Sequence, residues 1–301
     1  MKSRQDMNRR TFLRNSAGVM AAGFAASHFT APESGAQEAT AAVTGFDPCE
    51  RCALGSTGVH PTRLGMGTGI NGWNNQSALT RKGNDAFMNL LRYSYDNGMR
   101  YYDLADVYGS HSYLKEAMDD FMDRDEVTII TKSFTRDAEE LAADIERYRQ
   151  ELNTDYIDGV LLHCLTDPDW TENMKDCMDV LSDAQAKGWI KAKGVSCHNF
   201  DAMAAGAESP WVDILLARIN PFGAHMDGPT EDVVQVLRTA HDSGKGVLGM
   251  KILGEGTIAD RKEESLEFVL NLGCVDAMTI GFLNPEDMGE IMDLMRKTPV
   301  A

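Results

Sequence analysis

Short runs of apolar residues recur along the chain between residues 63 and 281. Within each run the apolar positions are nearly continuous rather than alternating, which is typical of parallel strands that are covered on both faces. These runs predict eight strands, at 63–67, 99–104, 126–132, 156–163, 192–196, 214–220, 246–251 and 277–281.

Between these runs the apolar residues recur every three to four positions, which is the spacing of an amphipathic helix. Glycine follows several of these segments, as at Gly98 and Gly244, and Ser112 or Asn199 begins others, so helix stop and start signals stand where helices should end and begin. The predicted helices are 84–96, 112–122, 138–152, 171–187, 199–207, 230–243, 258–272 and 284–295.

Eight strand–helix pairs in sequence predict an α/β fold, a (β/α)8 or TIM barrel. The alternative is an open doubly wound sheet, which favours a Gly-x-Gly-x-x-Gly turn directly after the first strand. Gly65-Met-Gly67-Thr-Gly69 lacks that spacing, and its helix begins too late. A single barrel is therefore the expected fold.

The first 46 residues do not follow this pattern. Asn8-Arg9-Arg10-Thr11-Phe12-Leu13-Arg14 precedes a weakly apolar stretch, 15–27, that is too short to span a bilayer. The segment resembles a bacterial twin-arginine export signal, although an amphipathic helix that happens to carry two arginines is the alternative. We predict a signal peptide over 1–36 with cleavage near Ala36, a flexible tether over 37–46, and a single barrel over 47–301. The resemblance implies passage through the twin-arginine translocase to a periplasmic or other extracytoplasmic location.

Composition is that of an ordinary globular protein, with 43% hydrophobic and 25% charged residues among 301. The formal net charge is −17, from 46 acidic and 29 basic side chains. Such an acidic chain is a poor partner for a phosphate backbone, so nucleic acid is not expected as a ligand. No heptad pattern indicates a partner helix, and we expect a monomer.

Polar side chains follow three successive predicted strands. Asp103 and Tyr108 come after the second strand, Lys132 ends the third, and His163 ends the fourth. In a parallel barrel the carboxyl ends of the strands form one rim, and chemistry is placed there. Each residue alone has a structural explanation, such as an ion pair of Lys132 with Asp103 or a packed tyrosine. Together they predict a proton-donating site.

The chain resembles the aldo-keto reductase superfamily over about residues 50–300. The likeness is carried by these segments in this order: Ala53-Leu-Gly-Ser-Thr-Gly-Val, Arg63-Leu-Gly-Met-Gly-Thr-Gly, Asp103-Leu-Ala-Asp-Val-Tyr108-Gly, Lys132, Leu162-His163, Gly194-Val-Ser196, and Met250-Lys251-Ile-Leu-Gly254. The resemblance implies an oxidoreductase that passes a hydride from NAD(P)H to a carbonyl, in an aldehyde, ketone or sugar.

The same resemblance implies a role for each catalytic candidate. Tyr108 is expected to be the general acid, and a nearby Lys132 ammonium is expected to lower its pKa. Asp103 is expected to hold Lys132, and His163 to orient the substrate carbonyl.

The cofactor site departs from the family pattern. Cys197, Leu216 and Met250 stand where the family carries an amide or an aromatic side chain, and no Arg or Lys for a 2′-phosphate follows the eighth strand. NADP(H) is preferred over NAD(H) only as the family default. The expected cofactor contacts are Ser196, Asn199, Asn220, Met250, Lys251, Gly281 and Asn284.

Loops at the rim are expected to choose the substrate. Trp73, Trp170 and Phe222 are candidates for an apolar wall around a small carbonyl or sugar, although the tryptophans can instead cap the barrel. His225 and Asp227 are weak evidence for a metal, and none is expected. Asp106 and His111, which flank Tyr108, are interpreted as solvated loop residues.

Six cysteines are scattered along the chain, and only Cys49 and Cys52 are close in sequence. After export this pair can form a disulfide, and free thiols or a metal site are the alternatives.

The altered cofactor positions leave two alternative functions open. One is a non-redox barrel enzyme, a lyase or hydrolase. The other is a binding subunit that keeps only the fold.

Overall fold

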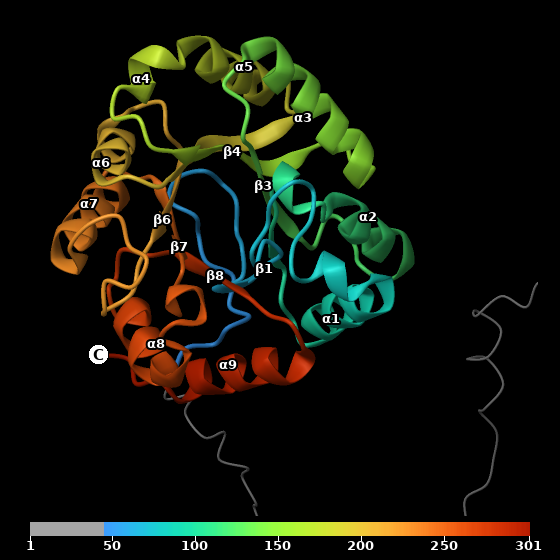
Figure 1. The fold of residues 1–301 in the computed structure, drawn as a ribbon, viewed down its shortest axis with the longest axis vertical. Helices are drawn as coiled ribbons and strands as arrows, with labels where there is room; N and C mark the ends of the chain where they lie inside the picture. The colour runs from blue at the N-terminus through green and yellow to red at the C-terminus, as the bar shows by residue number, and fades with distance from the viewer. Residues whose placement is uncertain (1–44) are drawn as a thin grey trace, which may run out of the picture. The chain divides into compact units, whose positions relative to one another are not determined.

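The computed structural model describes residues 45–301. The predicted signal peptide and residues 37–44 of the predicted tether lie outside the described residues. Eight parallel strands pair with their neighbours in sequence order, and β8 pairs with β1 to close a barrel (Figure 1). The strands are β1 (Leu64–Gly67), β2 (Tyr101–Asp103), β3 (Thr128–Ser133), β4 (Ile157–Leu165), β5 (Ile190–Cys197), β6 (Ile214–Arg218), β7 (Gly246–Met250) and β8 (Ala277–Gly281). The predicted (β/α)8 fold is confirmed.

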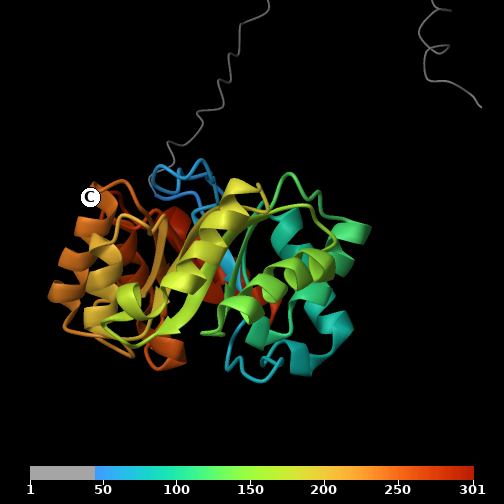
Figure 2. The same cartoon turned by 90° about the horizontal axis from the view of Figure 1, so that it is seen from above.

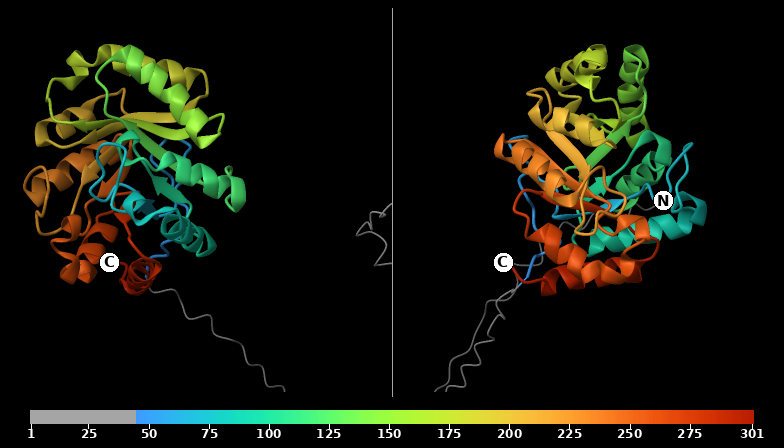
Figure 3. Two further views of the ribbon diagram at one scale, coloured as in Figure 1. Left: turned by 45° about the vertical axis from the view of Figure 1, so that its right-hand side comes forward. Right: turned by 60° about the vertical axis from the view of Figure 1, so that its left-hand side comes forward.

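Helices follow the strands and surround the barrel in all directions (Figures 1 and 3). The helices are α1 (Asn84–Asp96), α2 (His111–Asp120), α3 (Ala138–Leu152), α4 (Trp170–Asn173), α5 (Lys175–Ala186), α6 (Phe200–Glu208), α7 (Thr230–Asp242), α8 (Lys262–Leu270) and α9 (Pro285–Lys297). The predicted helix 171–187 is broken into α4 and α5 at Met174, whose φ of −119° is not helical. The predicted helix 258–272 is shorter, because 3-10 turns precede α8.

The strands bury both faces, which explains their continuous apolar sequence. Alternate residues such as Tyr101, Ile130, Leu161 and Leu248 form a small cluster inside the barrel. The residues between them pack outward under the helices in a much larger cluster. The core is therefore layered, and a side chain's place along its strand decides which layer it joins.

A short hairpin before β1 closes one end of the barrel. Leu54 and Val59 belong to the inner cluster, and the Leu54 N–H donates to the Val59 carbonyl at 3.0 Å. Figure 2 shows this blue segment at one end and the cyan segment that follows β1 at the other. Apolar side chains fill the amino end of the barrel, so we expect a ligand to bind at the carboxyl end of the strands.

The last residue of the predicted tether is fixed to the barrel. The Phe46 N–H donates to the Met295 carbonyl of α9 at 3.0 Å, and the Arg63 guanidinium lies over the Phe46 ring. Figure 3 shows the red helix α9 beside the blue start of the described chain.

The two closely spaced cysteines form no disulfide in the described part of the chain. The Cys49 thiol donates to the Asn97 carbonyl at 3.1 Å, and the Cys52 thiol lies 3.7 Å from the Glu50 carbonyl. Within residues 45–301 we find no helix that is long and apolar enough to cross a membrane.

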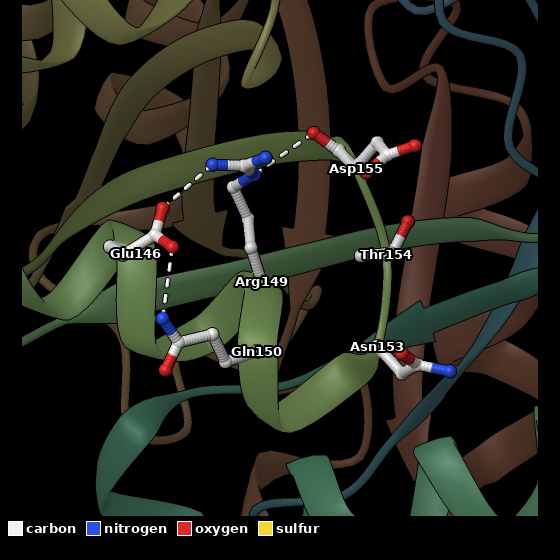
Figure 4. A pocket seen from close by; sticks show the side chains of 6 residues that line it. All are labelled: Glu146, Arg149, Gln150, Asn153, Thr154 and Asp155. Carbon is white, nitrogen blue, oxygen red and sulfur yellow. Dashed lines mark hydrogen bonds and ion pairs between the residues drawn. The ribbon is translucent and has the colours of Figure 1, made fainter.

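A surface hollow lies at the end of α3 and the loop before β4, at the closed end of the barrel (Figure 4). Two of its charged side chains, Glu146 and Arg149, are paired with each other. Arg149 donates to Glu146 at 2.7 Å and to the Asp155 carbonyl at 2.9 Å, and Gln150 donates to Glu146 at 2.9 Å. This hollow offers no reactive group and lies at the opposite end from the predicted site.

Candidate active site

The four predicted catalytic residues gather at the open, carboxyl end of the strands. Asp103 ends β2, Lys132 lies near the end of β3, and His163 lies near the end of β4. Tyr108 belongs to a 3-10 turn, Asp106–Tyr108, that follows β2. Neighbouring parallel strands thus bring together residues that are up to 60 positions apart in the sequence, since all of their carboxyl ends meet at one rim.

Lys132 and Asp103 form a buried ion pair. The Lys132 Nζ lies 2.7 Å from Asp103 Oδ1 and donates to the Leu104 carbonyl at 2.6 Å. Only 1% of the Lys132 side chain is exposed. Burial lowers the pKa of Lys132 and raises that of Asp103, and the attraction between the two charges opposes both shifts. The pair is therefore tightly positioned, and removal of one member would leave the other charge buried and uncompensated.

Tyr108 lies against this pair. The Lys132 ammonium is 5.1 Å from the centre of the Tyr108 ring, and the Tyr108 hydroxyl is 3.5 Å from His163 Nε2. Burial raises the pKa of Tyr108 well above its usual range, and the negative charge of Asp103 raises it further. The pKa of Tyr108 is thus raised in this structure rather than lowered, because burial is the largest influence on it. Tyr108 therefore retains its proton, which is the state that an acid needs.

Two glycines of the loop after β1 form a flat seat for the Tyr108 ring. A Cβ on Gly69 would lie 2.3 Å from the ring, and a Cβ on Gly72 would lie 2.4 Å from it. No side chain larger than hydrogen fits at either position without moving the tyrosine.

His163 is held as a neutral imidazole. Burial, followed by the positive charge of Lys132, lowers the pKa of His163 to about 2. Its Nδ1 is buried and has no hydrogen-bond partner within residues 45–301. Neutral His163 can donate a hydrogen bond from Nε2 to a carbonyl oxygen placed next to the Tyr108 hydroxyl.

The predicted cofactor contacts differ in whether their side chains already have hydrogen-bond partners within the protein. The Ser196 hydroxyl is fully buried at the end of β5 and has no partner in the described part of the chain. Asn199 caps α6, Asn284 caps α9, and all four hydrogen-bonding positions of the Asn220 amide are used by loop backbone. Ser196 is therefore the side chain that best fits the amide of a nicotinamide, and the three asparagines shape the loops.

The remaining cofactor candidates lie on β7 and β8. Met250 is buried in the inner cluster, where it can offer only an apolar surface. The Lys251 ammonium is 2.7 Å from Glu255 Oε1, and its φ of 58° is left-handed. Gly281 ends β8 beside Ile70. These positions stay predictions, and an anionic phosphate near Lys251 would compete with Glu255.

The three predicted substrate residues have very different surroundings. Trp73 is 62% exposed and meets the edge of Phe134 at 5.4 Å between ring centres, and Phe134 in turn meets His163 at 5.8 Å. Trp170 is completely buried, and its indole N–H donates to the Ala202 carbonyl. Phe222 lies under the Arg261 guanidinium, 3.7 Å away. Trp170 has no surface left for a ligand, so the structure gives it a packing role in place of the predicted substrate contact.

Sequence reasoning missed several residues at this rim. Phe134 comes two positions after Lys132, and this spacing could have placed it on the same rim. His111 is buried between Glu151 and Thr131, at 2.7 and 2.8 Å, and is not the solvated residue that was expected. Asp106 is ion-paired with Arg147 at 2.9 Å, which anchors the turn that carries Tyr108. Cys164 and His198 contact each other beside His163.

The described residues hold no cluster of three or more His, Cys, Asp or Glu side chains arranged to bind a metal. Arg218 instead pairs with Asp227, at 3.2 Å, and His225 faces Glu255.

Comparison with solved structures shows close agreement in fold. Two structures of proteins described as proposed aldo-keto reductases from Pseudomonas aeruginosa superpose with TM-scores of 0.71 at 22% and 23% identity. The matches cover 85% and 86% of this chain and 98% and 99% of theirs. The aldo-keto reductase AKR11C1 from Bacillus halodurans, in its holo form, superposes with a TM-score of 0.69 at 13% identity, over 84% of this chain and 93% of that one. At such identities the likeness concerns the fold alone.

A search of curated protein sequences found no significant match to this chain. The sequence model of the aldo/keto reductase family matches residues 63–270, a span that includes seven of the eight strands and all four catalytic candidates. The chain belongs to the aldo/keto reductase family.

Proposed function

We propose that the protein is an NAD(P)H-dependent reductase that converts the carbonyl of an aldehyde, ketone or sugar to an alcohol, with Tyr108 as general acid. The observation that supports this most is the joint geometry of the rim. A protonated Tyr108 hydroxyl points to a neutral His163, and a buried Lys132–Asp103 pair lies behind its ring.

The chain's own residues account for the binding of the carbonyl and the movement of the proton. A carbonyl oxygen between Tyr108 and His163 accepts a hydrogen bond from each, which polarises the carbonyl. As negative charge develops on that oxygen, the Tyr108 proton moves to it, and the transient phenolate is stabilised by the adjacent Lys132 ammonium. Asp103 keeps this ammonium in place. NAD(P)H, when bound, supplies the hydride.

Ser196 and Lys251 are the side chains that we propose to hold the cofactor, and NADP(H) is proposed over NAD(H). The unpartnered Ser196 hydroxyl suits the carboxamide, and Lys251 suits a phosphate. Fluorescence quenching of the purified protein by NADPH and by NADH tests this. We expect tighter binding of NADPH, and binding of neither nucleotide would point to a non-redox enzyme or a binding subunit.

Substitution of Tyr108 tests the acid. We expect Tyr108→Phe to lower kcat by about 10²-fold or more, because the proton donor is lost, with NADPH binding retained. Tyr113→Phe is the matched control. Tyr113 lies in α2 and stacks on Phe87 of α1, with 4.5 Å between the ring centres, and it does not belong to the rim. Steady-state reduction of a panel of aldehydes and ketones is the measurement. Full activity of Tyr108→Phe would refute the assigned mechanism.

We also propose that residues 1–36 direct export by the twin-arginine translocase and that the mature enzyme acts outside the cytoplasm as a monomer. The support is the Arg9-Arg10 pair with its Phe-Leu sequence. Replacing both arginines by lysine is expected to keep the protein in the cytoplasm in cell fractionation. Arg4→Lys is the control, and export of the double variant at the normal level would contradict the proposal. N-terminal sequencing of the exported form locates the cleavage site.

A further inference from the structure

Strand β4 has an irregularity at the point where it enters the active site. Leu162 pairs with Val195 and Leu165 pairs with Cys197, so two residues of β4 lie opposite the single residue Ser196 of β5. The two β4 residues that lie opposite Ser196 are His163 and Cys164. A bulge of this kind changes the direction in which a side chain points.

The bulge changes the layer that Cys164 joins. Leu161 belongs to the inner cluster and Leu162 to the outer one, so strict alternation would place His163 inside and Cys164 outside. Instead Leu165 returns to the outer cluster, and Cys164 takes a left-handed backbone with φ of 59°. That backbone is unfavourable for a residue other than glycine. Arg136 holds it by donating to the carbonyls of both His163 and Cys164, at 2.8 and 3.2 Å.

The redirected thiol meets an imidazole. The Cys164 Sγ lies 2.7 Å from His198 Nδ1, and His198 follows β5 with its N–H bound to the Leu165 carbonyl at 2.8 Å. Burial raises the pKa of the Cys164 thiol and lowers the pKa of His198 to about 3, so both groups are neutral at rest. The thiol therefore donates to Nδ1. A thiol hydrogen-bonded to a neutral imidazole has the base for its proton already in place.

This pair belongs to the same site as the acid. The rings of His163 and His198 meet at 6.3 Å between centres, and a thiolate at Cys164 would raise the pKa of Tyr108, so the two groups are electrostatically coupled. Four cations, Arg218, Arg136, Lys132 and Lys251, favour negative charge on the Cys164 sulfur. Cys164 is also partly exposed, whereas Cys177, Cys197 and Cys274 are buried.

Two buried polar atoms beside the bulge are left without partners in the described part of the chain. One is the Ser196 hydroxyl, directly opposite the bulge, and the other is His163 Nδ1. A buried polar group without a partner needs a physical explanation, and a catalytic role is one of them. Ser196 is fully buried and His163 is 5% exposed, so neither can rely on bulk water.

We propose that Cys164 and His198 form a nucleophilic dyad that captures aldehydes reversibly as a hemithioacetal in the Tyr108–His163 site. The Cys164 sulfur forms a bond to the aldehyde carbon, and the carbonyl π bond becomes a C–O single bond. The thiol proton passes to His198 Nδ1, and the carbonyl oxygen gains one proton from Tyr108, which is reprotonated from His198 through solvent. The net reaction is R–CHO + Cys–SH to R–CH(OH)–S–Cys, with no oxidation and no leaving group.

Aldehydes are the class that this site selects. Their carbonyl carbon carries one hydrogen and is less hindered and more electrophilic than that of a ketone, so thiol addition favours aldehydes strongly. The inference rests on the proposed function only in placing the carbonyl oxygen at Tyr108 and His163. Because a captured aldehyde is no longer a carbonyl, the dyad restrains aldehyde turnover at high aldehyde concentration and leaves ketones unaffected.

Carbon-13 NMR of the full-length protein without nucleotide tests the capture. The probe is 4-nitrobenzaldehyde labelled with ¹³C at the carbonyl, and 4-nitroacetophenone labelled in the same way is the ketone control. We expect a protein-bound tetrahedral carbon signal with the aldehyde only. The signal is expected to fall by about tenfold or more in Cys164→Ser and to persist in Cys52→Ser, a partly exposed thiol at the closed end of the barrel. Cys164→Gly is a second variant, because glycine adopts the left-handed backbone without strain.

The kinetic arm separates this inference from the proposed function. NADPH oxidation is measured with both probes over a wide concentration range, and wild-type aldehyde turnover is expected to decline at high aldehyde while the Cys164 variants show no decline. Absence of the tetrahedral signal in the wild type, or its persistence in both Cys164 variants, would overturn the dyad even where reduction proceeds normally. Absence of any NADPH oxidation would overturn the proposed function, and the NMR result would still stand or fall on its own.

Discussion

Lys132 and Cys164 are each held in a state that is unfavourable for their residue type, burial for the lysine and a left-handed backbone for the cysteine. A lysine that is 1% exposed is retained because Asp103 and the Leu104 carbonyl receive its hydrogens. A cysteine with a left-handed backbone is retained because Arg136 binds the carbonyl beside it and His198 binds its thiol. Both arrangements carry a cost in stability, of about 1–3 kcal/mol for such a backbone. Such costs are concentrated at functional sites.

The backbone strain at Cys164 can be measured by comparing two substitutions that both remove the thiol. We expect Cys164→Gly to be more stable than Cys164→Ala by about 1 kcal/mol, because glycine has no Cβ to oppose a φ of 59°. The measurement is the free energy of unfolding in urea. At Ala192 in regular strand β5 the order is expected to reverse, with glycine less stable than alanine. Equal stability of the two Cys164 variants would show that the bulge carries no strain.

At the scale of elements, the site depends on loops that the barrel holds close together. The 3-10 turn Asp106–Tyr108 is anchored from outside by the ion pair of Asp106 with Arg147 of α3. From inside, the Tyr108 ring rests on Gly69 and Gly72 of the loop after β1. The same loop carries Trp73, which reaches Phe134 of the loop after β3. The position of the tyrosine hydroxyl is thus set by three loops together.

A methyl group at Gly69 should displace the Tyr108 ring. We expect Gly69→Ala to lower kcat by about tenfold to a hundredfold with the fold intact, since its Cβ would lie 2.3 Å from the Tyr108 ring. Carbonyl reduction and circular dichroism are the measurements. Gly206→Ala on α6, where the nearest atoms are side-chain carbons at 3.1 Å and beyond, is the control. An unchanged kcat in Gly69→Ala would mean that the loop moves more easily than the ring.

At the scale of the whole molecule, the chain has a net charge of −17, yet several basic side chains gather at its open rim. Lys132, Arg136, Arg218 and Lys251 all act on Cys164, and Lys132, Arg136 and Lys251 also keep His163 neutral by opposing its protonation. Three of these cations are paired with Asp103, Asp227 and Glu255, and this arrangement places positive charge beside His163. It also couples the stability of the barrel to pH.

The barrel should lose stability in acid through its buried histidines. The folded-state pKa of His163 is about 2, whereas the ordinary value is 6.5, so below pH 6.5 the unfolded chain binds a proton that the folded chain refuses. The free energy of unfolding therefore falls as pH decreases from 6.5, by about 3 kcal/mol from His163 alone at about pH 4. His198, with a pKa of about 3, acts in the same direction.

Urea unfolding at neutral pH and at about pH 4 measures this effect. The difference in stability between the two pH values is expected to be smaller in His163→Gln than in the wild type, because glutamine takes up no proton. The comparison isolates the histidine from buried carboxyls such as Asp103, whose raised pKa acts in the opposite direction. The same pH dependence in both proteins would show that His163 protonates in the folded state.

Local sequence patterns were enough to predict the barrel and the four rim residues. Apolar periodicity and glycine stops depend on neighbours along the chain, which is why β8 was predicted with its observed bounds, 277–281, and α3 with 138–152. The order of Asp103, Tyr108, Lys132 and His163 on successive strands then placed them on one rim.

Features that depend on contacts between distant segments could not be predicted from local sequence patterns. Trp170 is buried because α4 packs on α6, and His111 because α2 packs on α3. Tyr108 keeps its proton because burial raises its pKa. The Cys164–His198 pair depends on a single extra residue in β4, which changes the direction of a side chain without changing the hydrophobic pattern. Periodicity predicts the layer that a side chain joins, whereas burial, charge compensation and register set the chemistry of the side chain.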